Sequence, residues 1–210
     1  MAKQLGKIKK PDAEHYINKR KLFVVPLIFS GEEAPTEYVE KFNLYWEQVT
    51  QHVANLESKI GKVSHIYQES ISLTGEKGLN VMEKLNPLCY QITQDKCQGG
   101  AVLETTEEGD LVEESMDWER CLLTVGFISK KVAKTVTEFY VEVLKKRFEH
   151  ISRRIDETLK ANEVGLLFIR EGHSVQFPQD IEVFSVVPPA LDEFRRWQRD
   201  RSSTNKKIEQ

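Results

Sequence analysis

The histidines are the residues of this 210-residue chain best suited to acid–base or metal chemistry, and there are five of them. His173 lies in "REGHSVQF", a Gly-containing connection between two apolar runs, where a general base could stand at the mouth of a sheet. Such a base needs an orienting carboxylate and a nucleophile within reach. Glu171 and Ser174 are close in sequence, but the G-x-S-x-G elbow is absent. The sequence favours a structural turn residue at His173, and a hydrolase-type site there is the alternative.

The spacing of the histidines does not resemble a metal site. No H-x-x-x-H or H-E-x-x-H pair occurs, and the histidines are scattered over separate segments. His65 and Glu69 are four residues apart, which would bring them together on a helix, but the alternation in this segment is typical of a strand. We therefore predict no metal and no cofactor. A pocket that collects His65, His173 and carboxylates would favour an enzyme.

The cysteines indicate neither a disulfide framework nor a zinc site. Cys89, Cys97 and Cys121 are odd in number and lack C-x-x-C spacing. We expect reduced thiols.

Gly75 and Gly78 in "TGEKGLN" weakly resemble a phosphate-binding loop before a helix. Neither the G-x-x-x-x-G-K-[ST] nor the G-x-G-x-x-G spacing is present. The stretch is better explained as the start of a helix.

Charge is distributed unevenly around a net value of −3. Positions 1–21 contain seven Lys or Arg and two acidic residues, and positions 195–210 contain six and two. The ends of the chain are therefore basic and the remainder is acidic. The densest acidic run, between Glu104 and Glu119, is interpreted as a solvated helix face or as a docking surface for a basic partner.

Two basic clusters are candidate partner-binding or nucleic-acid-binding sites. Lys146 and Arg153 are seven residues apart and share one face of a long expected helix. Near the C-terminus, the residues grouped around an aromatic ring are Arg195, Arg196, Trp197 and Arg199. Arginine beside tryptophan is suited to phosphate contact with base stacking, and equally to a protein interface.

Strand-like and helix-like segments alternate along the chain. Apolar residues recur every three or four positions from Tyr38 to Ile60 and again from Val132 to Leu159, which predicts two long amphipathic helices. Further helices are expected over 74–94, broken or bent near Pro87, over 110–125, and after Pro189. Strands are expected over 21–30, 63–70, 101–104, 164–169 and 180–187. Because Pro26 lacks an N–H, the first strand should lie at a sheet edge or break there.

These segments predict a single α/β domain over residues 21–200, with a small mixed sheet packed against long helices. Residues 1–20 are expected to be a basic arm and residues 201–210 a polar tail. No apolar run is long enough to span a bilayer, and the start "MAKQLGKIKK" lacks a secretory signal, so we expect a soluble, cytoplasmic protein without membrane association.

The segment "ISRRIDETLKANEVGLLFI" resembles the third domain of archaeal and eukaryotic peptide-chain release factors and their relatives, where a helix leads into a central strand. The matching residues are Ile155, Leu159, Val164, Leu166, Leu167 and Ile169. The Gly-Gly-Gln motif is missing, because Gln98-Gly99-Gly100 has the wrong order. The resemblance implies an α/β domain that associates with ribosomes. It implies no catalytic residues for this chain.

Three functions follow as hypotheses. The first is a non-catalytic interaction or regulatory protein that forms homo-oligomers or binds a protein partner, because the two long apolar stripes exceed what a small sheet can cover. The second is RNA or ribosome association through the basic C-terminal segment. The third is a hydrolase-type enzyme with a site near His173.

Overall fold

The computed structural model describes residues 18–31, 33–124 and 126–208, which form an α/β domain. Within these ranges, the sheet contains β1 (Arg20–Pro26), β2 (His65–Gln68), β3 (Val102–Leu103), β4 (Val164–Ile169) and β5 (Ile181–Ser185). The helices are α1 (Thr36–Ile60), α2 (Gly75–Leu85), α3 (Pro87–Gln98), α4 (Gly109–Thr124), α5 (Lys130–Thr158) and α6 (Pro189–Ile208). The α/β class expected from the alternating segments is confirmed.

The strands lie in the order β3-β2-β4-β1-β5, and each neighbouring pair is parallel. This is a more uniform sheet than the mixed one expected from the sequence. β4 lies at its centre and is buried along its whole length, as its continuous apolar run requires. The helix-to-strand junction expected between Ile155 and Ile169 is present, because α5 ends at Thr158 and leads into β4.

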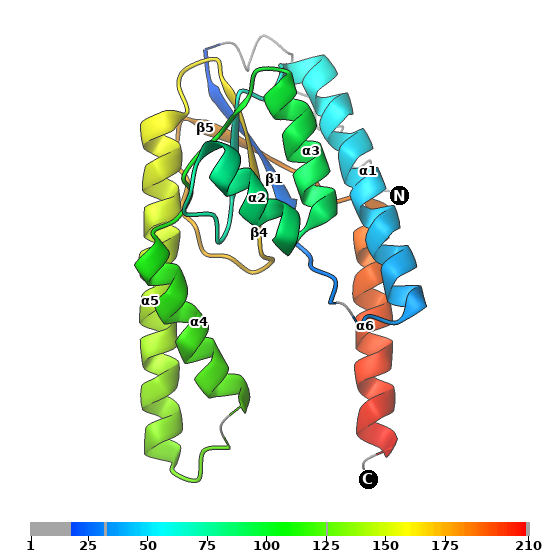
Figure 1. Cartoon of the computed structure of the whole chain (residues 1–210), viewed down its shortest axis with the longest axis vertical. Coiled ribbons are helices and arrows are strands. Elements are labelled where there is room, and N and C mark those ends of the chain that lie inside the picture. The colour runs from blue at the N-terminus through cyan, green and yellow to red at the C-terminus, as the bar shows by residue number, and fades with distance from the viewer. Residues whose placement is uncertain (1–17, 32, 125, 209–210) are drawn as a thin grey trace, which may run out of the picture.

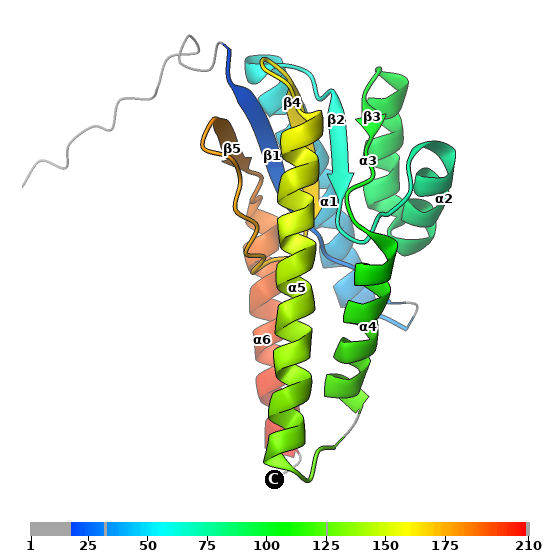
Figure 2. The same ribbon diagram turned by 90° about the vertical axis from the view of Figure 1, so that its left-hand side faces the viewer.

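Each face of the sheet has its own apolar core. Alternate side chains of β1 point to opposite faces, so that Phe23 packs with α1, α3 and α6 while Leu22 packs with α5. Figure 2 shows α5 lying across one face of the sheet, with α1 and α6 behind it. The apolar residues of α1 predicted from their spacing are buried at Phe42, Val49 and Val53.

Two helical structures project beyond the carboxyl edge of the sheet. The antiparallel α4–α5 hairpin extends on one side, and α6, which packs against α1, extends on the other (Figure 1). The two lie on opposite sides of the molecule in Figure 1. The hairpin is the part of the fold in which the long apolar stripe of α5 runs beyond the sheet.

Of the two alternatives for Pro26, the structure has the break. β1 is not an edge strand, because it is flanked by β4 and β5, and Pro26 is its last residue, paired with Ile169, so the expected strand over 21–30 ends there. Ending the strand there limits the cost of the missing N–H. Pro87 begins a new helix, where Asn86 caps the first turn by accepting from the Cys89 N–H at 3.1 Å. The break expected near Pro87 is therefore confirmed, and α2 and α3 are separate helices.

The expected basic arm and polar tail lie at the two ends of the chain. Residues 1–17 of the expected basic arm lie outside the described residues, and Arg20 already belongs to β1. The polar segment from Arg201 continues α6 as far as Ile208. In the described part of the chain, no helix is both long and apolar enough to cross a membrane.

Candidate functional site

The carboxyl edge of the sheet is where the topology favours a ligand site. The chain leaves β2 toward β3 along one face, and it leaves β4 toward β5 along the other face. In open α/β sheets, ligands bind in the crevice between strands whose connections diverge in this way. The residues that follow β2 and β4 are therefore the first place to look for a site.

This crevice is filled by a buried ion-pair network. Arg147 of α5 donates from Nε to Glu107 Oε2 at 2.6 Å and from Nη2 to Glu107 Oε1 at 2.5 Å. Glu69, directly after β2, lies 3.5 Å from Arg147 and also accepts from the backbone N–H and the Nε of Arg170 after β4. Two carboxylates and two guanidinium groups thus neutralise one another, and the side chains of Arg147, Glu69 and Glu107 are at most 3 % exposed. The crevice holds the protein's own charges where a ligand would otherwise bind.

His173 lies beside this network in an aromatic environment. Its ring makes edge contacts with Phe148 and Phe177, with centroids 6.5 and 6.0 Å apart. Burial lowers the pKa of His173, and the charge of Glu69 opposes this only in part. Its Nδ1 is buried without a hydrogen-bond partner among the described residues. Glu171, the carboxylate nearest in sequence, is bound to Arg195.

His65 is not brought together with His173. It begins β2, at the opposite edge of the sheet, and its Nδ1 and Nε2 lie 2.8 Å from Glu104 and 3.0 Å from Glu163. A pocket shared by the two histidines is therefore not formed. Within the described ranges, no cluster of three or more His, Cys, Asp or Glu is arranged to hold a metal ion.

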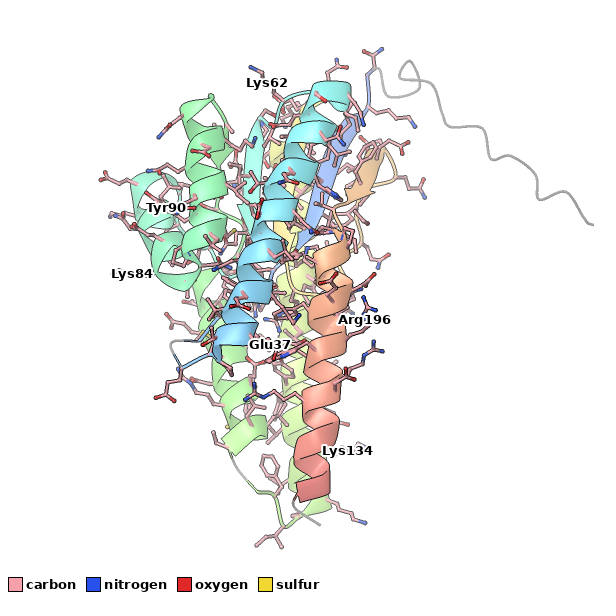
Figure 3. The ribbon with its side chains drawn as sticks, turned by 90° about the vertical axis from the view of Figure 1, so that its right-hand side faces the viewer. Glu37, Lys62, Lys84, Tyr90, Lys134 and Arg196 are labelled. Carbon is pink, nitrogen blue, oxygen red and sulfur yellow. The ribbon has the colours of Figure 1, made fainter. Side chains whose placement is uncertain are left out.

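The basic C-terminal cluster lines an open groove. Arg195, Arg196, Trp197 and Arg199, which sequence reasoning selected, border a groove of about 1620 Å³ on α6 together with Arg201. The remaining lining residues are Pro35, before α1, the Glu171–Gly172 turn after β4, and Asp192 and Gln198 of α6. Arg196 projects outward from α6 in Figure 3.

The groove residues are held in place by specific contacts. Arg195 donates to Glu171 and, at 2.8 Å, to Asp192 Oδ1, and the Glu171 carboxylate raises the Arg195 pKa. The guanidinium carbon of Arg201 lies 5.2 Å from the centre of the Trp197 ring. Trp197 also makes an edge contact with Tyr38 of α1, with ring centres 5.5 Å apart.

Lys146 and Arg153 lie elsewhere. Both are exposed on α5, across the sheet from α6, so the predicted basic residues form two separate groups. Lys146 pairs with Glu142 at 2.8 Å, and Arg153 borders a smaller groove of about 540 Å³ beside the loop after β4.

Sequence reasoning anticipated excess apolar surface on α5 and a possible docking role for the acidic run of α4, but it did not select the exposed apolar residues of α4 at the outer half of the α4–α5 hairpin. Large apolar side chains remain exposed there at Met116, Leu123, Ile128, Val132 and Phe139. Met116 and Leu123 are seven residues apart, as are Val132 and Phe139, so each pair lies on one face of its helix. This heptad spacing was a usable signal. It was hidden in α4 by the acidic residues between the apolar ones.

The comparisons with known proteins return no match: no family model fits the chain, and neither the curated proteins nor the solved structures include a significant relative.

Proposed function

We propose that this protein is a non-catalytic interaction protein that self-associates through the outer half of its α4–α5 hairpin. The observation that carries the proposal is the apolar face of this hairpin beyond the sheet. Leu123 is 79 % exposed, Phe139 is 46 % exposed and Ile128 is fully exposed. Large apolar side chains exposed together at the projecting end of a fold are the kind of surface that interaction sites use.

The hairpin is a rigid platform for such contacts. Trp118 of α4 stacks on Phe139 of α5 with ring centres 5.1 Å apart, and the Tyr140 hydroxyl donates to Glu119 at 3.2 Å. At its base, Arg147 Nη1 donates to Ser115 Oγ at 2.8 Å. Because the two helices are already paired, docking of a second hairpin would complete a four-helix bundle without a large ordering cost.

Charge favours a second copy as the occupant. Between residues 110 and 124, α4 carries five acidic residues and one basic residue, whereas α5 between 130 and 146 carries five lysines and two glutamates. In a two-fold arrangement, the acidic α4 of one copy lies against the basic α5 of the other, and the same contact is repeated by symmetry.

The test is the molar mass in solution as a function of protein concentration, measured by sedimentation for the wild type and for a Leu123→Glu/Val132→Glu variant. We expect the wild type to form dimers and the variant to raise the dimer Kd by about tenfold or more, because carboxylates at an apolar contact cost at least ~1.4 kcal/mol. Both positions are exposed, so the variant should retain the wild-type circular dichroism spectrum.

Leu85→Glu is the matched control, because Leu85 on α2 is also an exposed large apolar residue, at 43 %. It should leave the dimer Kd unchanged. A wild type that stays monomeric at high concentration would refute the proposal, and so would a dimer that the hairpin variant and the control affect equally.

The proposed location is the cytoplasm. The three cysteines are unpaired in the fold, as expected where thiols are kept reduced. Cell fractionation with an antibody against the chain would test this location.

A further inference from the structure

We infer that the groove on α6 binds single-stranded nucleic acid through its phosphodiester groups and bases. The groove is bordered by four arginines, Arg195, Arg196, Arg199 and Arg201, by no lysine, and by two carboxylates, Glu171 and Asp192. Guanidinium groups bind phosphate oxygens in a two-pronged geometry and also stack on bases. This site is independent of the hairpin and lies on the other face of the sheet (Figure 2).

The arrangement of the arginines is suited to a chain of phosphates. From Arg195 to Arg201 the side chains are distributed over about 9 Å of helix, at 1.5 Å per residue. A groove of about 1620 Å³ also exceeds what a lone inorganic anion needs. The site therefore matches successive phosphates of one strand.

Trp197 and Arg201 provide a platform for a base. The Arg201 guanidinium lies over the Trp197 ring, and Trp197 is anchored from the side by Tyr38. Unpaired bases stack on aromatic rings and on guanidinium planes, at about 1–3 kcal/mol per base. An aromatic ring fixed among arginines combines both kinds of contact in one place.

A protein partner fits this groove less well. Protein interfaces have an apolar centre, but the apolar residues bordering the groove are Pro35 and Trp197, and the ring of Trp197 already contacts Tyr38 and Arg201. Contacts here depend on charge and stacking, which are the terms that dominate single-strand binding.

Glu171 restrains one of the four cations. It accepts from both Nε and Nη2 of Arg195, so part of the positive charge is neutralised inside the site. Removing this carboxylate leaves Asp192 as the acidic partner of Arg195 and lowers the negative charge inside the groove. The Glu171→Gln variant should bind nucleic acid more tightly than the wild type, a gain that unfolding cannot imitate.

The experiment measures fluorescence anisotropy of labelled single strands of about 12 nucleotides, as RNA and as DNA, over a range of salt concentrations. We expect the wild type to bind with log Kd changing by about 2 per tenfold change in salt, as for three neutralised phosphates of a single strand. Arg196→Ala/Arg199→Ala should weaken binding at least tenfold and flatten the salt dependence, and Glu171→Gln should strengthen binding. A preference for RNA or for DNA identifies the natural strand, and either result supports the site.

The control is Lys146→Ala/Arg153→Ala, which removes the same charge from exposed positions on α5. It should bind like the wild type. The inference is overturned if no strand binds, if the control loses as much affinity as Arg196→Ala/Arg199→Ala, or if a duplex of equal length binds as tightly as the single strand.

Discussion

Arg147 and Glu107 form a two-point ion pair that joins α5 to the segment between β3 and α4, with N–O distances of 2.6 and 2.5 Å. The remaining Nη1 of Arg147 donates to Ser115 on α4, and Glu107 Oε1 accepts from the backbone N–H of Ser70 at 2.7 Å. One buried guanidinium thus connects both helices of the hairpin with the carboxyl edge of the sheet. The direction in which the hairpin projects depends on this connection.

Arg147→Met should lower the free energy of unfolding by about 3–5 kcal/mol, because it leaves the Glu107 carboxylate buried without its cation. Urea denaturation followed by circular dichroism measures this loss. Lys145→Met, two residues earlier on α5 but exposed, should cost less than ~0.5 kcal/mol.

The double variant Arg147→Met/Glu107→Gln isolates the electrostatic cause. Neutralising the abandoned carboxylate should restore part of the lost stability, so the two substitutions should not be additive. If the double variant is less stable than Arg147→Met, packing of the arginine side chain is the dominant contribution, and the electrostatic account fails.

Stability should fall as the pH decreases from 7 toward 5. Burial lowers the pKa of both His150 and His173 below the usual value of about 6.5, with Arg153 contributing at His150. In this range the two histidines bind more protons in the unfolded chain than in the folded chain. Their contribution to stability is therefore complete above the pKa of the unfolded state, and it is lost as the pH falls toward the lower pKa of the folded state.

Melting temperatures measured between pH 5 and pH 7 test this directly. His150→Gln/His173→Gln should flatten the dependence, and His52→Gln, which removes an exposed imidazole from α1, is the control. An unchanged slope in the double variant would show that other groups cause the loss.

Gly78→Ala should destabilise the protein even though alanine is the better helix former. A Cβ at position 78 would stand 2.4 Å from the Leu73 carbonyl oxygen and 3.1 Å from Leu103 Cδ2. The gain of about 1 kcal/mol expected in an open helix should be outweighed by ~1–3 kcal/mol of overpacking.

Gly109→Ala at the start of α4 is the comparison, because its Cβ would meet its nearest atom, Ser72 Oγ, at an ordinary 3.7 Å. Thermal unfolding of the two variants should show a loss for Gly78→Ala alone. Equal stability would mean that the turn at Leu73 can move aside.

The periodicity of apolar residues predicted the helices and strands well. A helix buried on one face has apolar residues every three or four positions, and a strand buried on both faces has a continuous apolar run. The stripe from Tyr38 to Ile60 became α1, and the continuous run at 164–169 became the central strand. Pro26 indicated where the first strand ends, because a missing N–H is tolerated at the last position of a central strand.

The functional groups were harder to predict, because long-range contacts leave no local signal. Arg147 has the same residue type as its exposed neighbour Arg153 on α5, and its burial follows from Glu107, which is 40 residues away. The α6 cluster was found because its members are adjacent in sequence. Glu171, which restrains Arg195, was considered only as a partner for His173.

The three thiols should react in an order set by their burial. Cys89 is fully buried with its Sγ 3.2 Å from Gln68 Oε1, and burial raises its pKa well above the ordinary thiol value. Burial also raises the pKa of Cys97, which is partly exposed, as is Cys121 on α4. A thiolate is the reactive form, so a disulfide reagent should modify Cys121 and Cys97 in the folded protein and reach Cys89 only when the chain opens.

A Cys97→Ser/Cys121→Ser variant makes this measurable, because Cys89 is then the single thiol. Its modification rate should be slow, should rise with urea in proportion to the unfolded fraction, and should be accelerated when Arg147→Met is added, since that change lowers the free energy of unfolding. Fast modification of Cys89 in the absence of denaturant would indicate that α3 opens locally without unfolding of the sheet.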